Sequence, residues 1–181
     1  MRERVLIDAC VLYPTVMREI VLGVAATGVF EPLWSARILE EWRRTALRRG
    51  QDAGAEIALA LSAWPSAEVV PGPEEEFDLP DPDDRHVLAA AVAGGADALM
   101  TLNVRDFPLR VLAAHGVQRR EPDAMLAAGA TAEVAAAVEE VRARAERLSG
   151  DPWGRGRLLR KARLPRLSKA LDRLEGAARP P

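Results

Sequence analysis

The chain of 181 residues has little cysteine and few aromatic side chains: one Cys in all, and 4% Phe, Trp and Tyr together. A single cysteine excludes an internal disulfide and is typical of a reducing compartment, so a cytoplasmic protein is expected. Aromatic surfaces on which successive bases of a single strand could stack are not expected. Long apolar runs are also lacking, so the sequence predicts neither a signal peptide nor a helix that enters a membrane.

Apolar residues make up 49% of the chain, which is enough for a sizeable core in one domain with an appendage. The formal net charge of −2 hides an uneven distribution. Residues 142–181 hold 12 Lys and Arg against 4 Asp and Glu, whereas residues 1–141 hold 13 against 23. The basic tail is of a kind that often attracts polyanions, while clustered carboxylates in the acidic body repel them unless cations intervene.

Short apolar runs alternate with helical patterns over the first two thirds of the chain, at residues 5–7, 29–34, 67–70 and 98–102. This alternation predicts an α/β fold with a short parallel sheet and helices on both faces, a three-layer α/β/α domain over residues 1–120. Alanine-rich and then basic helical patterns follow. We therefore expect residues 121–181 to form a C-terminal α-helical extension.

The segment from Asp81 to Pro108 combines a helix, a glycine break, a buried strand and an acidic turn. Asp84 opens the helix, whose apolar face is predicted from Val87, Leu88, Ala91 and Val92. In a parallel α/β sheet, ligands bind beyond the carboxyl ends of the strands. The loop after strand 98–102, which contains Asp106, is therefore a candidate site.

Four acids are candidates for one cleft: Asp8 after the first strand, Glu41 beside the buried face of a helix that follows Ser35, Asp84, and Asp106. A carboxylate at the exit of a buried strand is costly unless it is paired, hydrated or bound to a metal. The sequence has no Cys/His cluster for zinc and no GxxxxGK[ST] phosphate loop. Carboxylates suit Mg²⁺ or Mn²⁺, which can activate water for attack on a phosphodiester.

Each acid also has a simpler interpretation. Asp84 can be a helix N-cap, which the helix dipole stabilises. Glu41 can be an ordinary surface acid of an arginine-rich helix, and Asp106 a turn residue. Asp8 is the hardest to explain by solvation alone.

Other polar residues are assigned no chemical role. Asp81 and Asp83 are expected to be solvated loop residues, and His86 and His115 to lie on helix surfaces or at caps. The arginine-rich segment 155–173 is either a solvated face or a contact for RNA or a partner protein.

Three motifs occur in order: DACVLYP (8–14), SARILEEW (35–42) and DDRHVLAAAVAGGADALMTLNVRDFP (83–108). Together they resemble the motifs of PIN-domain ribonucleases of the virulence-associated protein C toxin type. The resemblance covers about residues 4–120. The tail, from REPDAML onward, resembles the helical extension that some of these proteins carry.

The resemblance implies a metal site. Asp8, Glu41 and Asp84 match the first three metal-site acids of the family. The fourth usually falls two residues after the strand-ending Thr, where this chain has Asn103. Asp106 would then supply the missing carboxylate, and Asn103 would bind the metal or its water through the amide carbonyl. The replacement of the fourth acid by Asn103 puts the binding of a second metal ion in question more than the binding of the first.

The implied activity is that of a Mg²⁺- or Mn²⁺-dependent endoribonuclease that leaves 3′-hydroxyl and 5′-phosphate ends. The resemblance also implies a toxin of a toxin–antitoxin pair, with RNA as substrate, an antitoxin protein as partner and a homodimer as the assembly. An antitoxin would inhibit by inserting a residue such as Arg among the acids. Cys10 stands where many relatives have Asn, and is interpreted as a packing residue.

Two other functions remain open from the sequence. One is a non-catalytic RNA- or protein-binding module with a degenerate metal site, which the Asn103 substitution favours. The other is a phosphatase of the haloacid dehalogenase type, which also begins with a strand-end Asp nucleophile. That chemistry needs a second Asp two residues later, and Cys10 occupies the position.

Overall fold

The computed structural model describes residues 2–178, and their contacts separate into two compact units. The first unit combines residues 2–13 with 30–120, and the second combines residues 14–29 with 121–178. The predicted division into residues 1–120 and 121–181 stays a prediction. By their contacts, residues 14–29 cluster with the C-terminal helices. No helix in the described part of the chain has the length and apolar character needed to cross a membrane.

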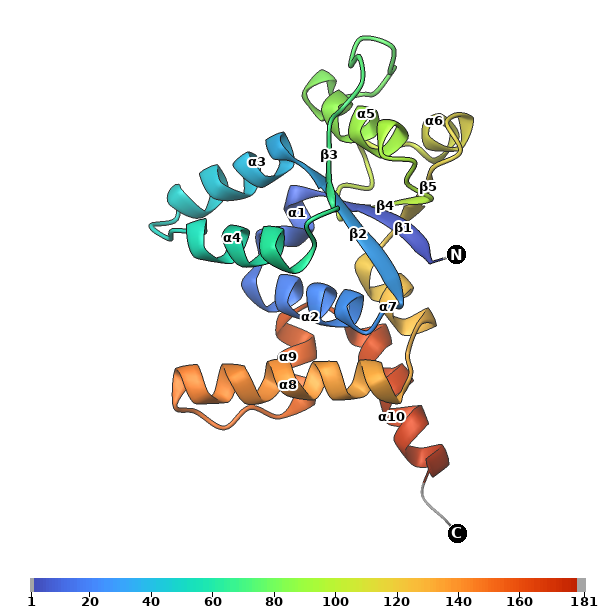
Figure 1. Cartoon of the computed structure of the whole chain (residues 1–181). Coiled ribbons are helices and arrows are strands. Elements are labelled where there is room, and N and C mark those ends of the chain that lie inside the picture. Colours follow the sequence, from blue (N-terminus) through green and yellow to red (C-terminus); the bar gives the residue numbers. More distant parts are fainter. Residues whose placement is uncertain (1, 179–181) are drawn as a thin grey trace. The chain divides into compact units, whose positions relative to one another are not determined.

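The first unit is built on a five-stranded parallel sheet (Figure 1). The strands run in the order β3-β2-β1-β4-β5. Val5–Ile7 in β1 and all of β4 are fully buried, which is why their sequences are continuous apolar runs. The predicted α/β fold is confirmed. The strands are β1 (Glu3–Ile7), β2 (Phe30–Ser35), β3 (Glu68–Val69), β4 (Ala98–Met100) and β5 (Gln118–Arg120).

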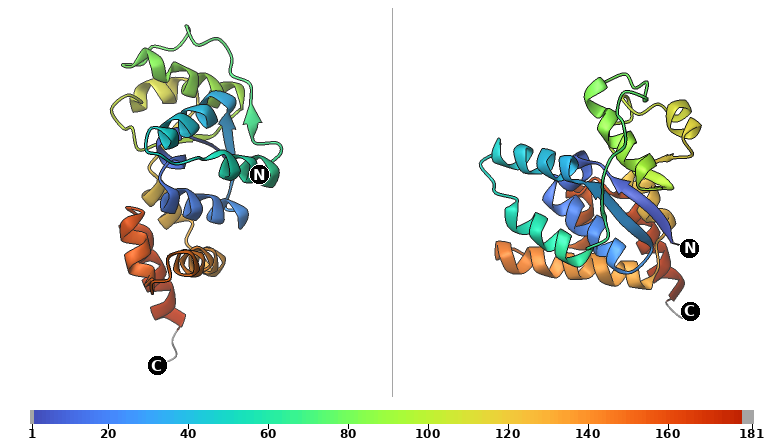
Figure 2. Two further views of the ribbon diagram at one scale, coloured as in Figure 1. Left: turned by 90° about the vertical axis from the view of Figure 1, so that its left-hand side faces the viewer. Right: turned by 45° about the horizontal axis from the view of Figure 1, so that its top comes forward.

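The chain moves from β1 through β2 to β3 at one edge, then returns to the other side of β1 for β4 and β5. Right-handed crossovers therefore place α3 (Ala36–Leu47) and α4 (Gly54–Ala63) on one face of the sheet, and α5 (Arg85–Ala93) and α6 (Leu109–Ala114) on the other (Figure 2). The direction of winding reverses between β1 and β4. The carboxyl ends of these two strands are therefore the expected ligand site.

Local capping positions the elements that reach this end of the sheet. Asp8 caps α1 (Ala9–Leu12) by accepting a hydrogen bond from the Cys10 backbone N–H. Ser35 caps α3, as predicted, by accepting from the Ile38 N–H at 3.3 Å. A 3₁₀ turn, η1 (Pro82–Asp84), precedes α5, so this helix begins one residue after Asp84.

The second unit is helical. Its elements are α2 (Thr15–Ala26), α7 (Pro122–Ala128), α8 (Ala132–Ser149), α9 (Arg155–Lys161) and α10 (Pro165–Ala178). Thr131 caps α8, and Gly150 ends it with a φ of 71°, a conformation that glycine adopts without strain. The Asp123 carboxylate of α7 accepts from the Arg166 and Leu167 N–H groups at the start of α10. The C-terminal helices predicted from the sequence are confirmed.

Two local predictions are wrong in detail. Val92, expected on the apolar face of α5, is 40% exposed, whereas its neighbour Ala91 in the last turn of the helix is fully buried. The strand predicted over 98–102 ends at Met100, where the chain turns into the loop that carries Asn103.

Candidate metal centre and active-site cleft

Asp8 and Thr101 bring the carboxyl ends of β1 and β4 together. The Asp8 N–H donates to the Met100 carbonyl at 3.0 Å, which continues the sheet by one residue. The Thr101 hydroxyl donates to Asp8 Oδ2 at 2.6 Å. Asp8 is only 7% exposed, so its carboxylate is held in a fixed direction by a buried donor.

Cys10 is a second support of the same carboxylate. Its thiol lies 3.1 Å from Asp8 Oδ2, to which it donates, and its sulfur accepts from the Leu102 N–H at 3.2 Å. Burial, and then the negative charge of Asp8, raise the pKa of the Cys10 thiol to about 12. Cys10 therefore stays protonated as a hydrogen-bond donor, and is more than the packing residue predicted from the sequence.

Asn103 connects this strand-end network to Asp84. Its backbone N–H donates to Thr101 Oγ1 at 2.9 Å, and its side-chain Nδ2 donates to Asp84 Oδ2 at 3.0 Å. Asp84 occupies the N-cap position of α5, but its side chain makes no capping hydrogen bond. The interpretation of Asp84 as a simple helix cap is therefore wrong, since its carboxylate is directed to Asn103 instead.

A cleft of about 430 Å³ opens at this end of the sheet, entirely within the first unit. Three acids distant in sequence, Asp8, Glu41 and Asp84, line it together with Asn103. The structure thus brings together three of the four acids predicted for a shared site. The remaining lining residues are Ala9, Cys10, Tyr13, Thr45 and Arg48.

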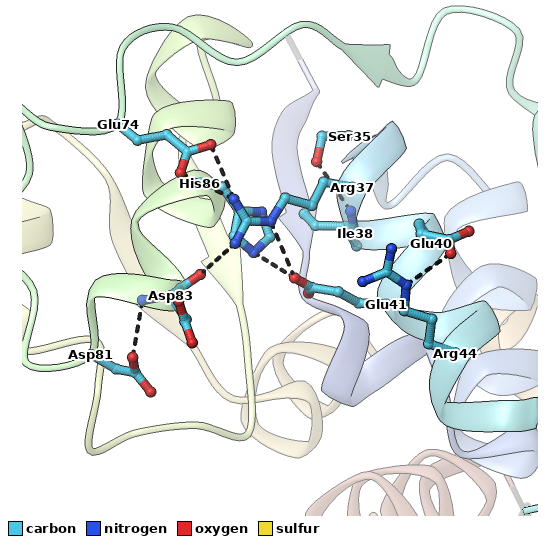
Figure 3. Close-up of polar contacts among 10 residues, drawn as sticks. All are labelled: Ser35, Arg37, Ile38, Glu40, Glu41, Arg44, Glu74, Asp81, Asp83 and His86. Atoms are coloured by element: carbon cyan, nitrogen blue, oxygen red, sulfur yellow. Dashed lines mark hydrogen bonds and ion pairs between the residues drawn. The ribbon is translucent and has the colours of Figure 1, made fainter. Parts of the chain in front are cut away.

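Glu41 reaches the cleft from α3 and is bound by His86 of α5 (Figure 3). His86 Nε2 lies 2.8 Å from Glu41 Oε1, and Arg37 Nε lies 3.5 Å from the same oxygen. The Nδ1 atom of His86 is buried with no hydrogen-bond partner among residues 2–178. The Nε2 atom therefore carries the proton toward Glu41, because a proton on Nδ1 would be buried without an acceptor.

The expectation that His86 lies on a helix surface is wrong, because it is only 1% exposed. Its position falls three and four residues before Ala89 and Ala90, on the face of α5 that packs into the core. Glu40, the neighbour of Glu41, instead pairs with Arg44 on the side of α3 away from His86 (Figure 3). This difference between Glu40 and Glu41 agrees with the choice of Glu41 from its helical spacing.

A second group of acids shares Asp84. One carboxylate oxygen from each of Asp81, Asp84 and Asp106 lies within 4.8 Å of the others, a separation that one cation could bridge. Asp81 had been interpreted as a solvated loop residue. Although it is exposed, its Oδ1 accepts from the Asp83 N–H at 2.9 Å, which fixes the turn before α5. Asp106 lies beside Asp84 as predicted, but it is not among the residues that line the cleft.

The electrostatics of Asp84 reflect this crowding. Its pKa is raised from 3.8 to about 6, first by burial and then by the negative charges of Asp8, Asp81 and Asp106, against a smaller lowering by His86. A carboxylate so surrounded gains from any cation that reaches it. Because the donors here are carboxylate and amide oxygens, the cluster is consistent with a divalent cation of the hard class, such as Mg²⁺ or Mn²⁺.

Comparison with known proteins gives one match. No curated protein and no solved structure matches the chain. The model of the PIN domain family matches residues 4–105, which is more than half of the sequence. The matched range holds Asp8, Glu41, Asp81 and Asp84 and ends one residue before Asp106. Together with the parallel sheet and the acids at its carboxyl edge, this match shows that the chain belongs to the PIN domain family.

Proposed function

We propose that this PIN-domain protein is a metal-dependent endoribonuclease that hydrolyses RNA phosphodiesters with Mg²⁺ or Mn²⁺. PIN domains are typically metal-dependent nucleases. The observation that carries the proposal is the arrival of Asp8, Glu41 and Asp84 in one cleft from three distant parts of the chain. Their mutual repulsion costs stability, and a bound cation would remove that cost.

The residues divide into ligands and supports. Asp8, Glu41 and Asp84 would hold the ion, with the carbonyl of Asn103 as a further oxygen ligand and Asp106 as a neighbouring carboxylate. When bound, the ion supplies charge stabilisation on the phosphate and lowers the pKa of water. The acids fix where the ion binds, and the cleft wall determines how the RNA approaches it.

The supports act through hydrogen bonds to the ligands. Thr101 and Cys10 both donate to Asp8 Oδ2, and His86 donates to Glu41 Oε1. Such outer contacts orient metal ligands before the ion arrives, and losing one typically weakens metal binding about 10- to 100-fold.

We further propose that the protein is the toxin of a toxin–antitoxin pair of the virulence-associated protein C type. The support is the order and spacing of the three motifs DACVLYP, SARILEEW and DDRHVL…TLNVRDFP. Its substrate would be RNA with unstacked, accessible bases, cut to leave 3′-hydroxyl and 5′-phosphate ends. An antitoxin protein would block the acids with an Arg side chain, and a homodimer would present two such clefts.

A non-catalytic binding module is the second candidate. The bond from Asn103 Nδ2 to Asp84 favours it, because an amide donor partly satisfies the carboxylate without an ion. RNA binding without cleavage would support this alternative.

The test is cleavage of total RNA with Mg²⁺ or Mn²⁺ by the wild type, Asp84→Asn and the control Glu40→Gln. We expect cleavage by the wild type and the control, its loss with a chelator, and a decrease of about 100-fold or more in Asp84→Asn. Ligation of adaptors to the products tests for 5′-phosphate ends. Equal cleavage by the wild type and Asp84→Asn would exclude the proposed site.

A further inference from the structure

One face of α3 forms a wall of the cleft. Glu41, Thr45 and Arg48 all line it, and they follow one another at i, i+4 and i+7. At the rise of an α-helix, Thr45 lies about 6 Å and Arg48 about 10 Å along the axis from Glu41. The wall therefore begins with a carboxylate and ends with a hydroxyl and a guanidinium.

Two arginines of α3 and its C-cap residue, Arg48, have different partners. Arg43 and Arg44 both pair with Glu40, at 3.6 Å and 2.9 Å, as expected for solvent-facing i,i+3 and i,i+4 partners. Arg48 instead donates from Nη2 to Thr45 Oγ1 at 3.1 Å. This contact directs its guanidinium along the cleft wall, where its other N–H donors can reach a ligand.

A second guanidinium lies next to a residue of the cleft lining. Tyr13 lines the cleft, and the guanidinium of Arg49 lies 5.0 Å from the centre of its ring. Two guanidinium groups, those of Arg48 and Arg49, thus lie at or next to a cleft that Asp8, Glu41 and Asp84 also line.

We propose that Thr45 and Arg48 bind a second phosphate of the RNA, next to the phosphodiester held at the acids. The proposal rests on the proposed function and adds a substrate preference to it. A guanidinium with a neighbouring hydroxyl is a common phosphate-binding pair, and such backbone contacts position a nucleic acid without reading its sequence. RNA lying along α3 would place one phosphate at the metal ligands and the next toward Arg48. A substrate with at least two phosphates would therefore bind more tightly than one with a single phosphate.

The first experiment compares Arg48→Gln with Arg44→Gln, a matched change on the same helix outside the cleft. Binding of a fluorescent single-stranded RNA of about ten nucleotides is followed by anisotropy in Ca²⁺, with melting temperatures as a check of folding. We expect Arg48→Gln to bind about tenfold more weakly and Arg44→Gln to bind as the wild type does. The dependence of log K on log salt should become shallower by about 0.7 in Arg48→Gln alone, as for one lost phosphate contact on a single strand.

The second experiment measures cleavage of the same RNA and of a dinucleoside monophosphate, which carries only one phosphate. Arg48→Gln should raise KM on the longer RNA with little change in kcat, and should match the wild type on the dinucleotide. Equal loss on both substrates, or equal binding by Arg48→Gln and Arg44→Gln, would overturn the second phosphate site. Anisotropy measures binding and does not depend on cleavage. A wild type that does not cleave RNA would therefore refute the proposed nuclease activity, while the anisotropy data would still show whether Arg48 binds a phosphate.

Discussion

Protons and metal ions should compete for Asp84, and the structure gives the size of the effect. The pKa of this carboxyl is raised to about 6, chiefly by burial and then by neighbouring carboxylates. Because the ion binds the ionised form, its apparent affinity decreases as Asp84 takes up a proton. With a pKa of about 6, the affinity for Mn²⁺ should be about tenfold lower at pH 5 than at pH 7.

The same shift predicts how the metal-free protein responds to pH. The folded state holds the Asp84 proton more tightly than the unfolded state, where the pKa is near 3.8. The stabilising contribution is therefore present in full below about pH 4 and is lost as the pH rises through about 6. The full shift corresponds to about 3 kcal/mol, which solvent screening of this half-buried side chain reduces to about 1 kcal/mol.

Asp84→Asn should therefore stabilise the metal-free protein at neutral pH while abolishing its response to the ion. The amide keeps the shape of the side chain and an acceptor for the Asn103 Nδ2 donor. In chelator at pH 7, we expect the variant to melt about 2–4 °C above the wild type, and the difference to shrink toward pH 5. Adding Mn²⁺ should raise the melting temperature of the wild type and leave that of Asp84→Asn nearly unchanged.

Thermal melts and calorimetric Mn²⁺ titrations at the two pH values measure these effects, with Glu40→Gln as the control acid on α3. Glu40 pairs with arginines outside the cleft, so its variant should bind Mn²⁺ as the wild type does. The reasoning fails if the Mn²⁺ affinity is the same at both pH values. It fails equally if Asp84→Asn melts at or below the wild type in chelator at pH 7.

Three further predictions follow from other contacts. His86→Leu should weaken Mn²⁺ binding about 10- to 100-fold in a calorimetric titration. His86→Gln keeps a side-chain donor and should retain most of the Mn²⁺ affinity. Equal losses of affinity in the two variants would contradict the role of His86 in positioning Glu41. Cys10, with its pKa near 12, should react with iodoacetamide near pH 8 about a thousandfold more slowly than in the unfolded chain, as followed by mass spectrometry. Gly94→Ala should cost about 1–3 kcal/mol in chemical denaturation, because its Cβ would lie 2.9 Å from Val69 Cγ1, while Gly72→Ala, in open space, should be nearly neutral.

The sheet and its acidic edge were predictable because the signals are local. Three apolar residues followed by Asp8 indicate a buried strand with a polar exit, and the run at Ala98–Met100 does the same for the neighbouring strand. Parallel pairing then brings the two exits together with no further information. Glu41 was predictable from helical spacing alone, because only one of two adjacent glutamates could face inward.

The rest of the site depends on contacts between segments that are distant in sequence. Nothing in the sequence of one segment indicates which other segment it contacts. His86 pairs with Glu41 across 45 positions of sequence, and one histidine in an alanine-rich helix does not reveal which face is buried. Asp81 joins the acids because a 3₁₀ turn bends the chain before α5, which an Asp-Pro-Asp-Asp sequence does not specify uniquely. Likewise, α2 clusters with the C-terminal helices through packing about a hundred residues away in sequence.

The amide of Asn103 has a consequence of its own. The side-chain amide has a hydrogen-bond donor, Nδ2, and an acceptor, Oδ1. A rotation of 180° about its terminal torsion exchanges their positions, and the torsion itself costs little energy. In the structure, Nδ2 donates a hydrogen bond to Asp84. After the rotation, Oδ1 would face an incoming ion without any movement of the backbone. An aspartate at this position would bind the ion more strongly but would repel Asp84 whenever the ion left. Asparagine at this position would thus favour a cleft that holds its shape without an ion, whereas aspartate would favour tight binding of one.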